Sequence, residues 1–462
     1  MTDLTAHGAL ELVRLVRSKE VSRREVVEAH FARIAAVNGS VNAIVELREA
    51  TLADAEAADA DHGRRAGLPL DGVPVSIKDH FDVEGMKHTE GVRALAERRS
   101  PGTSLAVERL LEAGAFVVGK ANQPDYAIRW NTVNDVYGPT RNPRDTALTA
   151  GGSSGGDAAA VASGMAALGL GGDYGGSTRV PASFCGIFGL RPSAGRVPDV
   201  QVLEPLGGLP TMDLMASVGP MARSLEDLWA AFRALAGPDP RDPVSLPVAA
   251  PPPAGERCHP PAAVRMCREA GATVEPEVER ELDRVCDALA NAGYEVVDGG
   301  IPGAVRAPEL WGELVGTEAL VYAMPVVGEQ MCESGRDHVE TMHGKLLGLG
   351  ERLEDYLRAA VERSRIAQQT AVWMEEHPLV VAPIAGMPTP PLDFDHLLSV
   401  DESRELFDRM RNVVWVNLLS LPGIALPNGV QIVARRFREA EALAAATVAA
   451  EALAPVAVAQ PA

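Results

Sequence analysis

The chain has 462 residues and a net charge of −20, from 43 lysines and arginines against 63 aspartates and glutamates. Its hydrophobic content of 46% fits a folded soluble protein and excludes wholesale disorder. An acidic chain without a run of five basic residues binds nucleic acid and anionic membranes poorly, so we expect neither as a partner.

Up to residue 120, the pattern of apolar residues predicts helices that alternate with short strands. The predicted helices cover 8–36, 51–64 and 104–113, and the predicted strands cover 73–77 and 115–118. Within 8–36, Ser22 and Glu25 have the spacing of a capping box, so a second helix begins there. His30 lies on or beside the apolar face of that helix, and we interpret it as a packing residue. This succession favours an α/β layered core.

Beyond residue 140 the composition changes several times. Residues 143–190 are dominated by glycine, alanine and serine, and residues 238–261 contain nine prolines, which is typical of an extended surface connection. Further helices are predicted at 224–235 and 276–292, and a further strand at 294–297. Residues 300–400 are irregular and only partly helical. The uncharged stretch 412–434 holds two prolines, which favours buried strands and turns over a membrane-spanning helix.

The cysteines, the histidines and the N-terminus indicate a cytoplasmic protein without a metal site. The five cysteines are odd in number and include no C-x-x-C pair, which is typical of a reduced compartment. The N-terminus shows no secretory signal pattern. No two of the ten histidines have a convincing ligand spacing, so we expect no zinc site.

Lysine is rare in this chain, since only five of the 43 basic residues are lysines. Lys78 directly follows the apolar run 73–77. An arginine stays protonated, whereas a buried lysine can lose its proton and act as a base. A lysine retained at this position therefore suggests base chemistry. The alternative is a lysine at a strand end whose amine reaches solvent.

The segment 151–156 places two hydroxyl groups, on Ser153 and Ser154, between pairs of glycines. It satisfies G-x-S-x-G, the nucleophile elbow of α/β-hydrolases. That elbow follows a buried strand, whereas residues 143–149 are polar and turn-like, so the elbow is disfavoured. A flexible linker is the other alternative, but the compact helix predicted directly afterwards argues against it.

A second glycine-rich segment, 169–179, contains Ser177. It fits neither the G-x-G-x-x-G dinucleotide pattern nor a P-loop, so phosphate binding has little support. Successive glycines before a serine can direct several backbone N–H groups to one point beside its hydroxyl, as an oxyanion requires. Lys78, Ser153 and Ser177 in this order indicate a catalytic site more specifically than any one of them alone.

These segments together resemble the amidase signature family, whose hydrolases use a Ser-cisSer-Lys triad. The 24-residue step from Ser153 to Ser177 is also the spacing of that family. The matching stretches are Gly72–Asp79, Gly119–Asn122, Arg141–Pro143, Gly151–Gly156, Gly172–Ser177 and Cys185–Pro192, with weaker similarity at Gly219–Ser224 and Gly429–Gln431. The resemblance therefore covers nearly the whole chain.

The resemblance implies an α/β fold in which helices cover both faces of a large twisted mixed sheet. It implies a single domain over 1–462, with the signature core at about 65–235 and a variable substrate-pocket region at about 240–400. Asp157, Gly172 and Tyr174 differ from the residues that the family usually has at these positions. These differences leave the catalytic positions intact but leave the packing of the loops and the shape of the pocket open.

The resemblance assigns a role to each of the three catalytic positions. Ser177 is the nucleophile, Ser153 is the bridging serine after a cis peptide bond, and Lys78 is the terminal base. The backbone amides expected to line the oxyanion hole are those of Tyr174, Gly175, Gly176 and Ser177. A serine hydroxyl needs a partner that takes its proton, and Lys78 must be neutral to do this. Burial therefore has to lower its pKa from about 10.4.

Residues around the triad receive supporting roles. We expect Ser154 and Asp173 to hold the loops in place, and Arg179 to pair structurally with a nearby carboxylate or carbonyl. The candidate residues of the acyl pocket are Tyr126, Ile128, Trp130, Tyr174 and Phe184. Trp311 and Met331 are candidates to complete that pocket. The alternative is that most of these side chains belong to the core.

The implied reaction is hydrolysis of a carboxamide to an acid and ammonia or an amine, through an acyl-enzyme on Ser177 and without a cofactor. An aryl or medium-sized aliphatic acyl group is favoured, and hydrazides, carbamates and esters remain open. A rival is the glutamine-hydrolysing subunit of a tRNA-dependent amidotransferase, which passes ammonia to a partner. A non-catalytic binding protein is disfavoured, because all three catalytic positions are present. The expected partner is a small-molecule amide, and a homodimer stays open.

Overall fold

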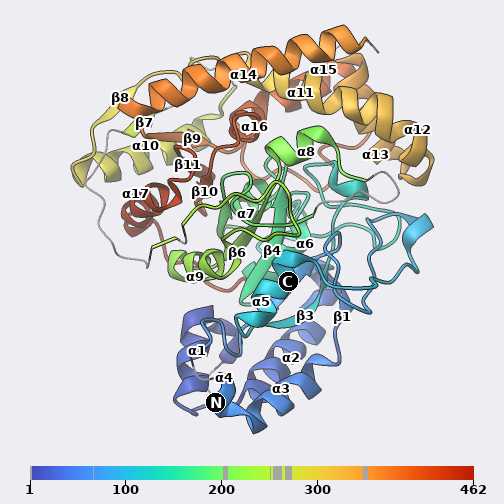
Figure 1. Ribbon diagram of the computed structural model, residues 1–462, viewed down its shortest axis with the longest axis vertical. Helices are drawn as coiled ribbons and strands as arrows, with labels where there is room; N and C mark the ends of the chain where they lie inside the picture. Colours follow the sequence, from blue (N-terminus) through green and yellow to red (C-terminus); the bar gives the residue numbers. More distant parts are fainter. Residues whose placement is uncertain are drawn as a thin grey trace.

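The structure, a computed structural model, describes residues 3–65, 67–200, 207–249, 251–252, 263–265, 273–346 and 352–461. Within these residues, eleven strands form one mixed sheet (Figure 1). The strands are β1 (Ile44–Leu47), β2 (Pro74–Lys78), β3 (Phe116–Ala121), β4 (Leu168–Asp173), β5 (Phe188–Arg191), β6 (Ser217–Ala222), β7 (Ala263–Arg265), β8 (Val296–Asp298), β9 (Leu379–Pro383), β10 (Gly423–Ala425) and β11 (Val430–Ala434). Their order in the sheet is β1-β3-β2-β4-β6-β5-β10-β11-β9-β7-β8.

The sheet is parallel in two places and antiparallel elsewhere. Strand β2 runs parallel to β3 and β4, and β7 runs parallel to β8 and β9. The other neighbouring strands are antiparallel. The predicted large mixed sheet is therefore confirmed, and the predicted strands at 73–77 and 115–118 correspond to β2 and β3.

The described residues also form helices between and around the strands. The α-helices are α1 (Ala9–Arg17), α2 (Arg23–Val41), α3 (Thr51–Ala60), α4 (His62–Arg65), α5 (Leu105–Glu112), α6 (Gly155–Ala162), α7 (Arg179–Phe184), α8 (Pro210–Met215), α9 (Leu225–Leu235), α10 (Pro276–Asn291), α11 (Ala307–Thr317), α12 (Met324–Val327), α13 (Glu333–His338), α14 (Leu353–Glu376), α15 (Val400–Arg409), α16 (Arg411–Leu418) and α17 (Glu439–Glu451). The 3-10 helices are η1 (Leu4–Ala6), η2 (Arg93–Leu95), η3 (Asp125–Ala127) and η6 (Gly328–Gln330), and the π-helices are η5 (Glu318–Ala323) and η7 (Val339–Lys345). In these ranges, no helix has both the length and the apolar composition needed to cross a membrane.

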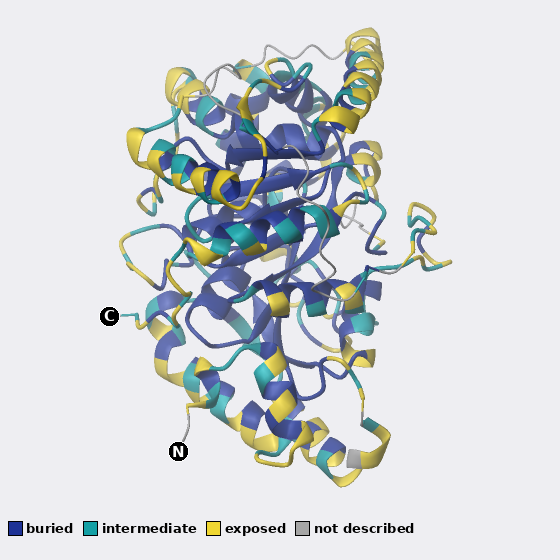
Figure 2. Ribbon diagram, turned by 90° about the vertical axis from the view of Figure 1, so that its left-hand side faces the viewer, coloured by how far each residue is buried: buried dark blue, intermediate teal, exposed yellow. Residues whose placement is uncertain are grey.

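Each face of the sheet packs into its own core. In β9, Leu379 and Val381 belong to one apolar cluster and Val380 and Ala382 to the other, as the two-residue period of a strand requires. Helices α1, α5, α9, α10 and α17 pack into the first cluster, and α6, α7, α11 and α16 into the second. Figure 2 shows buried strands between helices whose outer surfaces are exposed. Helices on both faces are therefore confirmed.

The N-terminal helices follow their sequence signals. The backbone N–H of Ser22 donates to the Glu25 carboxylate at 2.8 Å, and the Glu25 N–H donates to Ser22 Oγ at 3.1 Å, so α2 begins with the predicted capping box. His30 is buried in α2, and its Nδ1 lies 2.8 Å from the carbonyl oxygen of Val26. Its interpretation as a packing residue is confirmed.

Two parts of the chain differ from their predictions. Residues 412–434, predicted as strands and turns, begin within helix α16 before they form β10 and β11. Every residue of α16 is buried, including the polar Arg411, Asn412 and Asn417, so the helix has no exposed face and its sequence shows no amphipathic period. Residues 300–400 contain the long helix α14, two π-helices and strand β9, which the partly helical prediction did not separate. In the proline-rich segment, 238–249 contain neither helix nor strand, and 253–261 lie outside the described residues.

Candidate active site

Three segments that lie far apart in the sequence meet at the carboxyl ends of β2 and β4. These strands are parallel neighbours, so their last residues, Lys78 and Asp173, lie at the same edge of the sheet. After β4 the chain passes through Ser177 into α7, and the loop that carries Ser153 leads into α6. The apolar side chains of β2 face the cluster that contains α1, so strand alternation turns Lys78 toward the face where α6 packs.

The amine of Lys78 lies directly against Ser153. Its Nζ donates to Ser153 Oγ at 2.6 Å, and both residues are buried. The peptide bond between Gly152 and Ser153 is cis, as the resemblance implies. A Cβ at Gly152 would lie 2.6 Å from the carbonyl oxygen of Arg129, so a larger residue has no room there. The alternative of a Lys78 amine that reaches solvent is wrong, because this residue is only 1% exposed.

The surroundings of Lys78 favour its neutral form. Burial lowers its pKa to about 8, against the opposing attraction of the carboxylates of Asp157, Glu90 and Asp173. A large fraction of the amine is therefore neutral at mildly alkaline pH. A neutral amine next to a hydroxyl can accept the proton of that hydroxyl, which is the property of a general base.

Asp157 shares the buried environment of this lysine. It lies in the first turn of α6, and Ser76 Oγ donates to its Oδ1 at 2.7 Å. Ser76 and Lys78 are two residues apart in β2, so both point to the face that α6 covers. Asp157 Oδ2 is buried without a hydrogen-bond partner among the described residues. Burial raises the pKa of Asp157 to about 7, against the hydrogen bond from Ser76 and the attraction of Lys78.

The backbone of Ser177 is joined to the Ser153–Ser154 loop. The N–H of Ser154 donates to the carbonyl oxygen of Ser177 at 3.1 Å, and Ser154 Oγ donates to the carbonyl oxygen of Gly172 at 3.4 Å. Ser154 therefore holds the two loops together, as expected. In the described structure the side chains of Ser153 and Ser177 are not hydrogen-bonded to each other. Proton transfer from Ser177 to Ser153 thus stays a prediction.

The amides of the loop 174–177 do not all remain free for an oxyanion. The Gly176 N–H donates to Asp173 Oδ1 at 2.9 Å, so this amide is not available to an oxyanion. Its expected place in the oxyanion hole is therefore wrong. The amides of Tyr174, Gly175 and Ser177 have no acceptor among the described residues. Gly176 has a φ of +101°, a backbone conformation that favours glycine. The loop can therefore present three amides rather than four.

Asp173 and Arg179 form the centre of a buried polar cluster behind this loop. Arg179 donates to both oxygens of the Asp173 carboxylate, at 2.9 Å and 3.0 Å, which confirms its expected pairing. Arg179 also donates to Gln431 Oε1 and to Asn417 Oδ1, each at 2.7 Å. Burial opposes ionisation of Asp173, but the attraction of Arg179 and Arg191 outweighs it and holds the pKa of Asp173 well below its usual range. The sequence motifs did not single out Asn417.

Two indole rings bind carbonyl groups of the same loop. Trp130 Nε1 donates to the carbonyl oxygen of Gly175 at 2.8 Å, and Trp311 Nε1 donates to that of Tyr174 at 3.2 Å. Both tryptophans are only 6% exposed. They were singled out for the acyl pocket, and the structure brings both of them into contact with the loop 174–177, which we call the nucleophile loop after the role proposed below for Ser177.

The other candidates for the pocket occupy different places. Tyr126 and Met331 are buried in a small apolar cluster against which Ile128 packs, and the Tyr126 hydroxyl donates to Gln330 at 2.8 Å. Phe184 lines a separate pocket of about 420 Å³ that includes residues of α10 and the C-terminal segment. The structure therefore does not bring Phe184 together with Tyr126 and Ile128.

A hydrogen-bonded network that the sequence did not predict connects Tyr174, through Thr211, to the variable region. The Tyr174 hydroxyl bonds to Thr211 Oγ1, and Thr211 Oγ1 in turn donates to Glu318 at 2.5 Å. Tyr356 also donates to Glu318, at 2.7 Å. These residues lie on α8, η5 and α14, in segments without a family motif. No local signal in the sequence could have found them.

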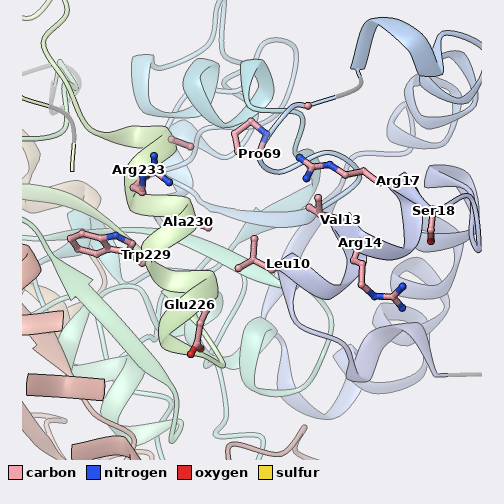
Figure 3. Close-up of a pocket in the computed structure, with 12 residues that line it drawn as sticks. Leu10, Val13, Arg14, Arg17, Ser18, Pro69, Glu226, Trp229, Ala230 and Arg233 are labelled. Atoms are coloured by element: carbon pink, nitrogen blue, oxygen red, sulfur yellow. The ribbon is translucent and has the colours of Figure 1, made fainter. Parts of the chain in front are cut away.

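A larger pocket lies elsewhere, between α1, α9 and the loop at 67–69 (Figure 3). Its volume is about 810 Å³, and Leu10 and Trp229 contribute to its apolar wall. Arg14, Arg17 and Arg233 also line it. None of its lining residues belongs to the candidate site.

Comparison with known proteins identifies the family of this chain. The chain matches the Amidase family over residues 25–443. Indoleacetamide hydrolase of Bradyrhizobium diazoefficiens is 32% identical over 453 residues, which cover 95% of this chain and 85% of that protein. One subunit of the glutamyl-tRNA(Gln) amidotransferase of Deinococcus radiodurans is 33% identical over 450 residues, which cover 92% of this chain and 90% of that protein. The structure of a 6-aminohexanoate cyclic dimer hydrolase has a TM-score of 0.82 and 27% identity, and the match covers 99% of this chain and 98% of that one. This chain therefore belongs to the amidase signature family of hydrolases that act on amide carbon–nitrogen bonds.

Proposed function

We propose that the protein hydrolyses a carboxylic acid amide through an acyl-enzyme on Ser177. The contact between the buried amine of Lys78 and Ser153 Oγ, at 2.6 Å, carries this proposal. It places a lysine with a lowered pKa against the serine whose loop is hydrogen-bonded to the backbone of Ser177. A buried lysine that loses its proton near pH 8 and contacts a hydroxyl is suited to act as a general base.

The reaction uses one proton relay in both directions. Ser177 Oγ attacks the amide carbon while its proton passes to Ser153 and the proton of Ser153 passes to neutral Lys78. The free amides of the loop 174–177 stabilise the charge that develops on the amide oxygen. The relay returns the proton to the leaving nitrogen, and the carbon–nitrogen bond breaks to give ammonia or an amine. Water then attacks the ester by the same relay, which releases the acid and restores Ser177.

An aryl or medium-sized aliphatic acyl group is the substrate class that we favour. The rings of Trp130, Trp311 and Tyr174 gather at the nucleophile loop, and the rings of Tyr174 and Trp311 meet edge to face at 6.3 Å. Such surfaces suit an apolar acyl chain or ring. The similarity to an indoleacetamide hydrolase supports an aromatic acyl group.

A glutamine-hydrolysing subunit is the second candidate function. The 33% identity to a subunit of glutamyl-tRNA(Gln) amidotransferase favours it. Such a subunit needs polar groups that hold the α-amino and α-carboxyl groups of glutamine. It also needs a partner that receives ammonia. The aromatic rings at the nucleophile loop disfavour this candidate relative to an apolar amide.

The first test is hydrolysis of a panel of acyl compounds by the purified chain. The panel contains indole-3-acetamide, an anilide, hexanamide, a hydrazide, a carbamate, an ester and glutamine, and release of the acid and of ammonia or amine is measured. We expect the highest kcat/KM with an aryl or medium-sized aliphatic amide. If glutamine were the best substrate, or if hydrolysis needed a partner protein, the second candidate would replace the first.

The pH dependence follows from the protonation of Lys78. The charged amine cannot accept a proton, so activity is lost as the pH falls below the pKa of about 8. We expect kcat/KM to decrease about tenfold per pH unit well below that value and to reach a plateau above it. A pH–rate profile measures this, and maximal activity in the acid range would contradict a neutral lysine base.

Replacing Asp157 by asparagine tests whether the pKa of Lys78 sets the pH dependence. The Asp157 carboxylate favours the protonated lysine, so its removal lowers the pKa of Lys78 further and moves the rising limb to lower pH. Asp401→Asn is the matched control, because the Asp401 side chain is 92% exposed on α15. A limb that stayed in place in Asp157→Asn would show that another group controls the rate.

A further inference from the structure

The peptide between Tyr174 and Gly175 is held by a residue from outside the signature core. Its carbonyl oxygen accepts the indole N–H of Trp311, which lies on α11. The same ring covers Gly175, where an added Cβ would lie only 2.8 Å from Trp311 Cζ2. Trp311 therefore contacts this peptide in two ways, through the hydrogen bond from Nε1 and through close packing of its ring carbons.

The hydrogen bond to the carbonyl also orients an amide. In a planar trans peptide the C=O and the N–H point in opposite directions. The N–H of this peptide belongs to Gly175, and it has no acceptor among the described residues. Holding the carbonyl oxygen of Tyr174 on one side therefore directs the Gly175 N–H to the other side, where it is free for an oxyanion.

The next peptide of the loop is fixed differently. Its carbonyl oxygen, on Gly175, accepts from Trp130 Nε1, and its N–H, on Gly176, donates to Asp173. Both ends of that peptide have partners, so it contributes no free amide. Within the described part of the chain, the side-chain hydrogen bond to the 174–175 peptide comes from Trp311. Trp311 and Trp130 thus hold consecutive peptides, but only Trp311 holds one with a free amide.

Trp311 is itself held in place. Its ring lies against Tyr174 at 6.3 Å and against His343 of η7 at 6.0 Å, measured between ring centres. Helix α11 continues directly into η5, where Glu318 accepts from Thr211, the partner of the Tyr174 hydroxyl. The same segment of the variable region therefore binds Tyr174 at its carbonyl and, through Thr211, at its side chain.

We infer that Trp311 is a positioning residue that directs the Gly175 amide at the oxyanion formed during acyl transfer. This inference rests on the proposed function of Ser177 as the nucleophile. It gives the variable region a part in the rate of the reaction, in addition to its expected part in the substrate pocket. A preoriented donor needs no reorganisation when the charge develops, which is why its direction affects the transition state more than the ground state.

Trp311→Phe tests this inference, because phenylalanine keeps an aromatic ring but has no N–H. Loss of an oxyanion donor lowers kcat by about 100- to 1000-fold, so loss of its orientation should lower kcat by about 10- to 100-fold with KM changed little. Affinity for an aldehyde analogue, which forms an oxyanion when Ser177 adds to it, should fall in parallel with kcat.

Trp229→Phe is the matched control. Trp229 is also a buried indole, and its Nε1 donates to the carbonyl oxygen of Pro252 at 2.9 Å in the core on the opposite face of the sheet. This variant should keep the kcat of the wild type. Should Trp311→Phe misfold, 3-benzothienylalanine at position 311 replaces the N–H by sulfur in a ring of nearly the same shape, and the same loss of kcat is expected.

The outcomes separate this inference from the function on which it rests. If kcat is unchanged in both position-311 variants while Ser177→Ala is inactive, or if only KM rises, Trp311 is a wall of the pocket and the inference is wrong. If Ser177→Ala is as active as the wild type, the proposed function fails and the inference falls with it. A lower kcat with weaker aldehyde binding and an unchanged KM would support the inference.

Discussion

Replacing Ser177 by alanine is expected to abolish turnover while the fold is retained. The change removes one oxygen atom from a residue that is 7% exposed, so packing changes little. Without this hydroxyl no acyl-enzyme forms, and loss of the nucleophile lowers kcat by about a million-fold in serine hydrolases. Steady-state hydrolysis of the best amide from the panel measures the effect. Covalent labelling by a serine-directed phosphonate should disappear in the same variant.

Ser183→Ala is the control for this experiment. Ser183 lies on α7, shortly after Ser177, and it is 9% exposed. Because it is not assigned to the triad, its replacement should leave kcat and phosphonate labelling close to those of the wild type. Thermal unfolding of all three proteins verifies that they are folded. Full activity of Ser177→Ala would refute the proposed reaction.

Replacing Lys78 is expected to have the second largest effect. Lys78→Ala removes the group that takes the proton from Ser153, and general-base catalysis contributes about 100- to 10,000-fold to a rate. Lys78→Arg is the more informative variant, because a guanidinium can donate to Ser153 but does not lose its proton. We therefore expect both variants to lose about 1000-fold or more in kcat.

Lys87→Arg is the matched control for the lysine variants. Lys87 pairs with Glu97 near the surface at 3.1 Å, and either side chain can make that ion pair. Its activity should equal that of the wild type. If Lys78→Arg kept most of its activity, the lysine would act only as a hydrogen-bond donor, and the role of a neutral base would be wrong.

The two buried lysines show how far the sequence could identify the base. Lys78 and Lys120 both lie near the ends of adjacent apolar strands, and a lysine that persists in an arginine-rich chain is notable at either position. In the structure, Lys120 Nζ donates to the backbone carbonyl oxygens of Asp79 and Phe81, whereas Lys78 Nζ contacts Ser153. Lys120 thus closes a turn. Without the family motif, only the tertiary partners separate a structural lysine from a candidate base.

The partners of the loop 174–177 also could not all be predicted from the sequence. Its glycines predicted a row of amides next to Ser177, and the loop lies where the motif placed it. The sequence did not reveal that the Gly176 amide would be taken by Asp173, or that two indoles would bind the loop carbonyls. Asp173 lies only three residues before Gly176, whereas the two indoles come from the distant positions 130 and 311. The positions of the indoles depend on which distant segments pack beside the loop, and local patterns carry no information about that.

The sequence by itself determined the local elements and supplied the residues that we propose as the reacting groups. The capping box of α2, the strands β2 and β3 and the glycine-rich loops are short-range features, set by backbone torsions and by spacing between neighbours. The tertiary structure alone decided the strand order, the fully buried helix α16, and three contacts: Trp311 with the carbonyl oxygen of Tyr174, Glu318 with Thr211, and Asn417 with Asp173. Those features arise from burial between elements far apart in the chain. A helix that is buried on all sides has no regular alternation of apolar and polar positions, so its sequence does not show the period of a helix.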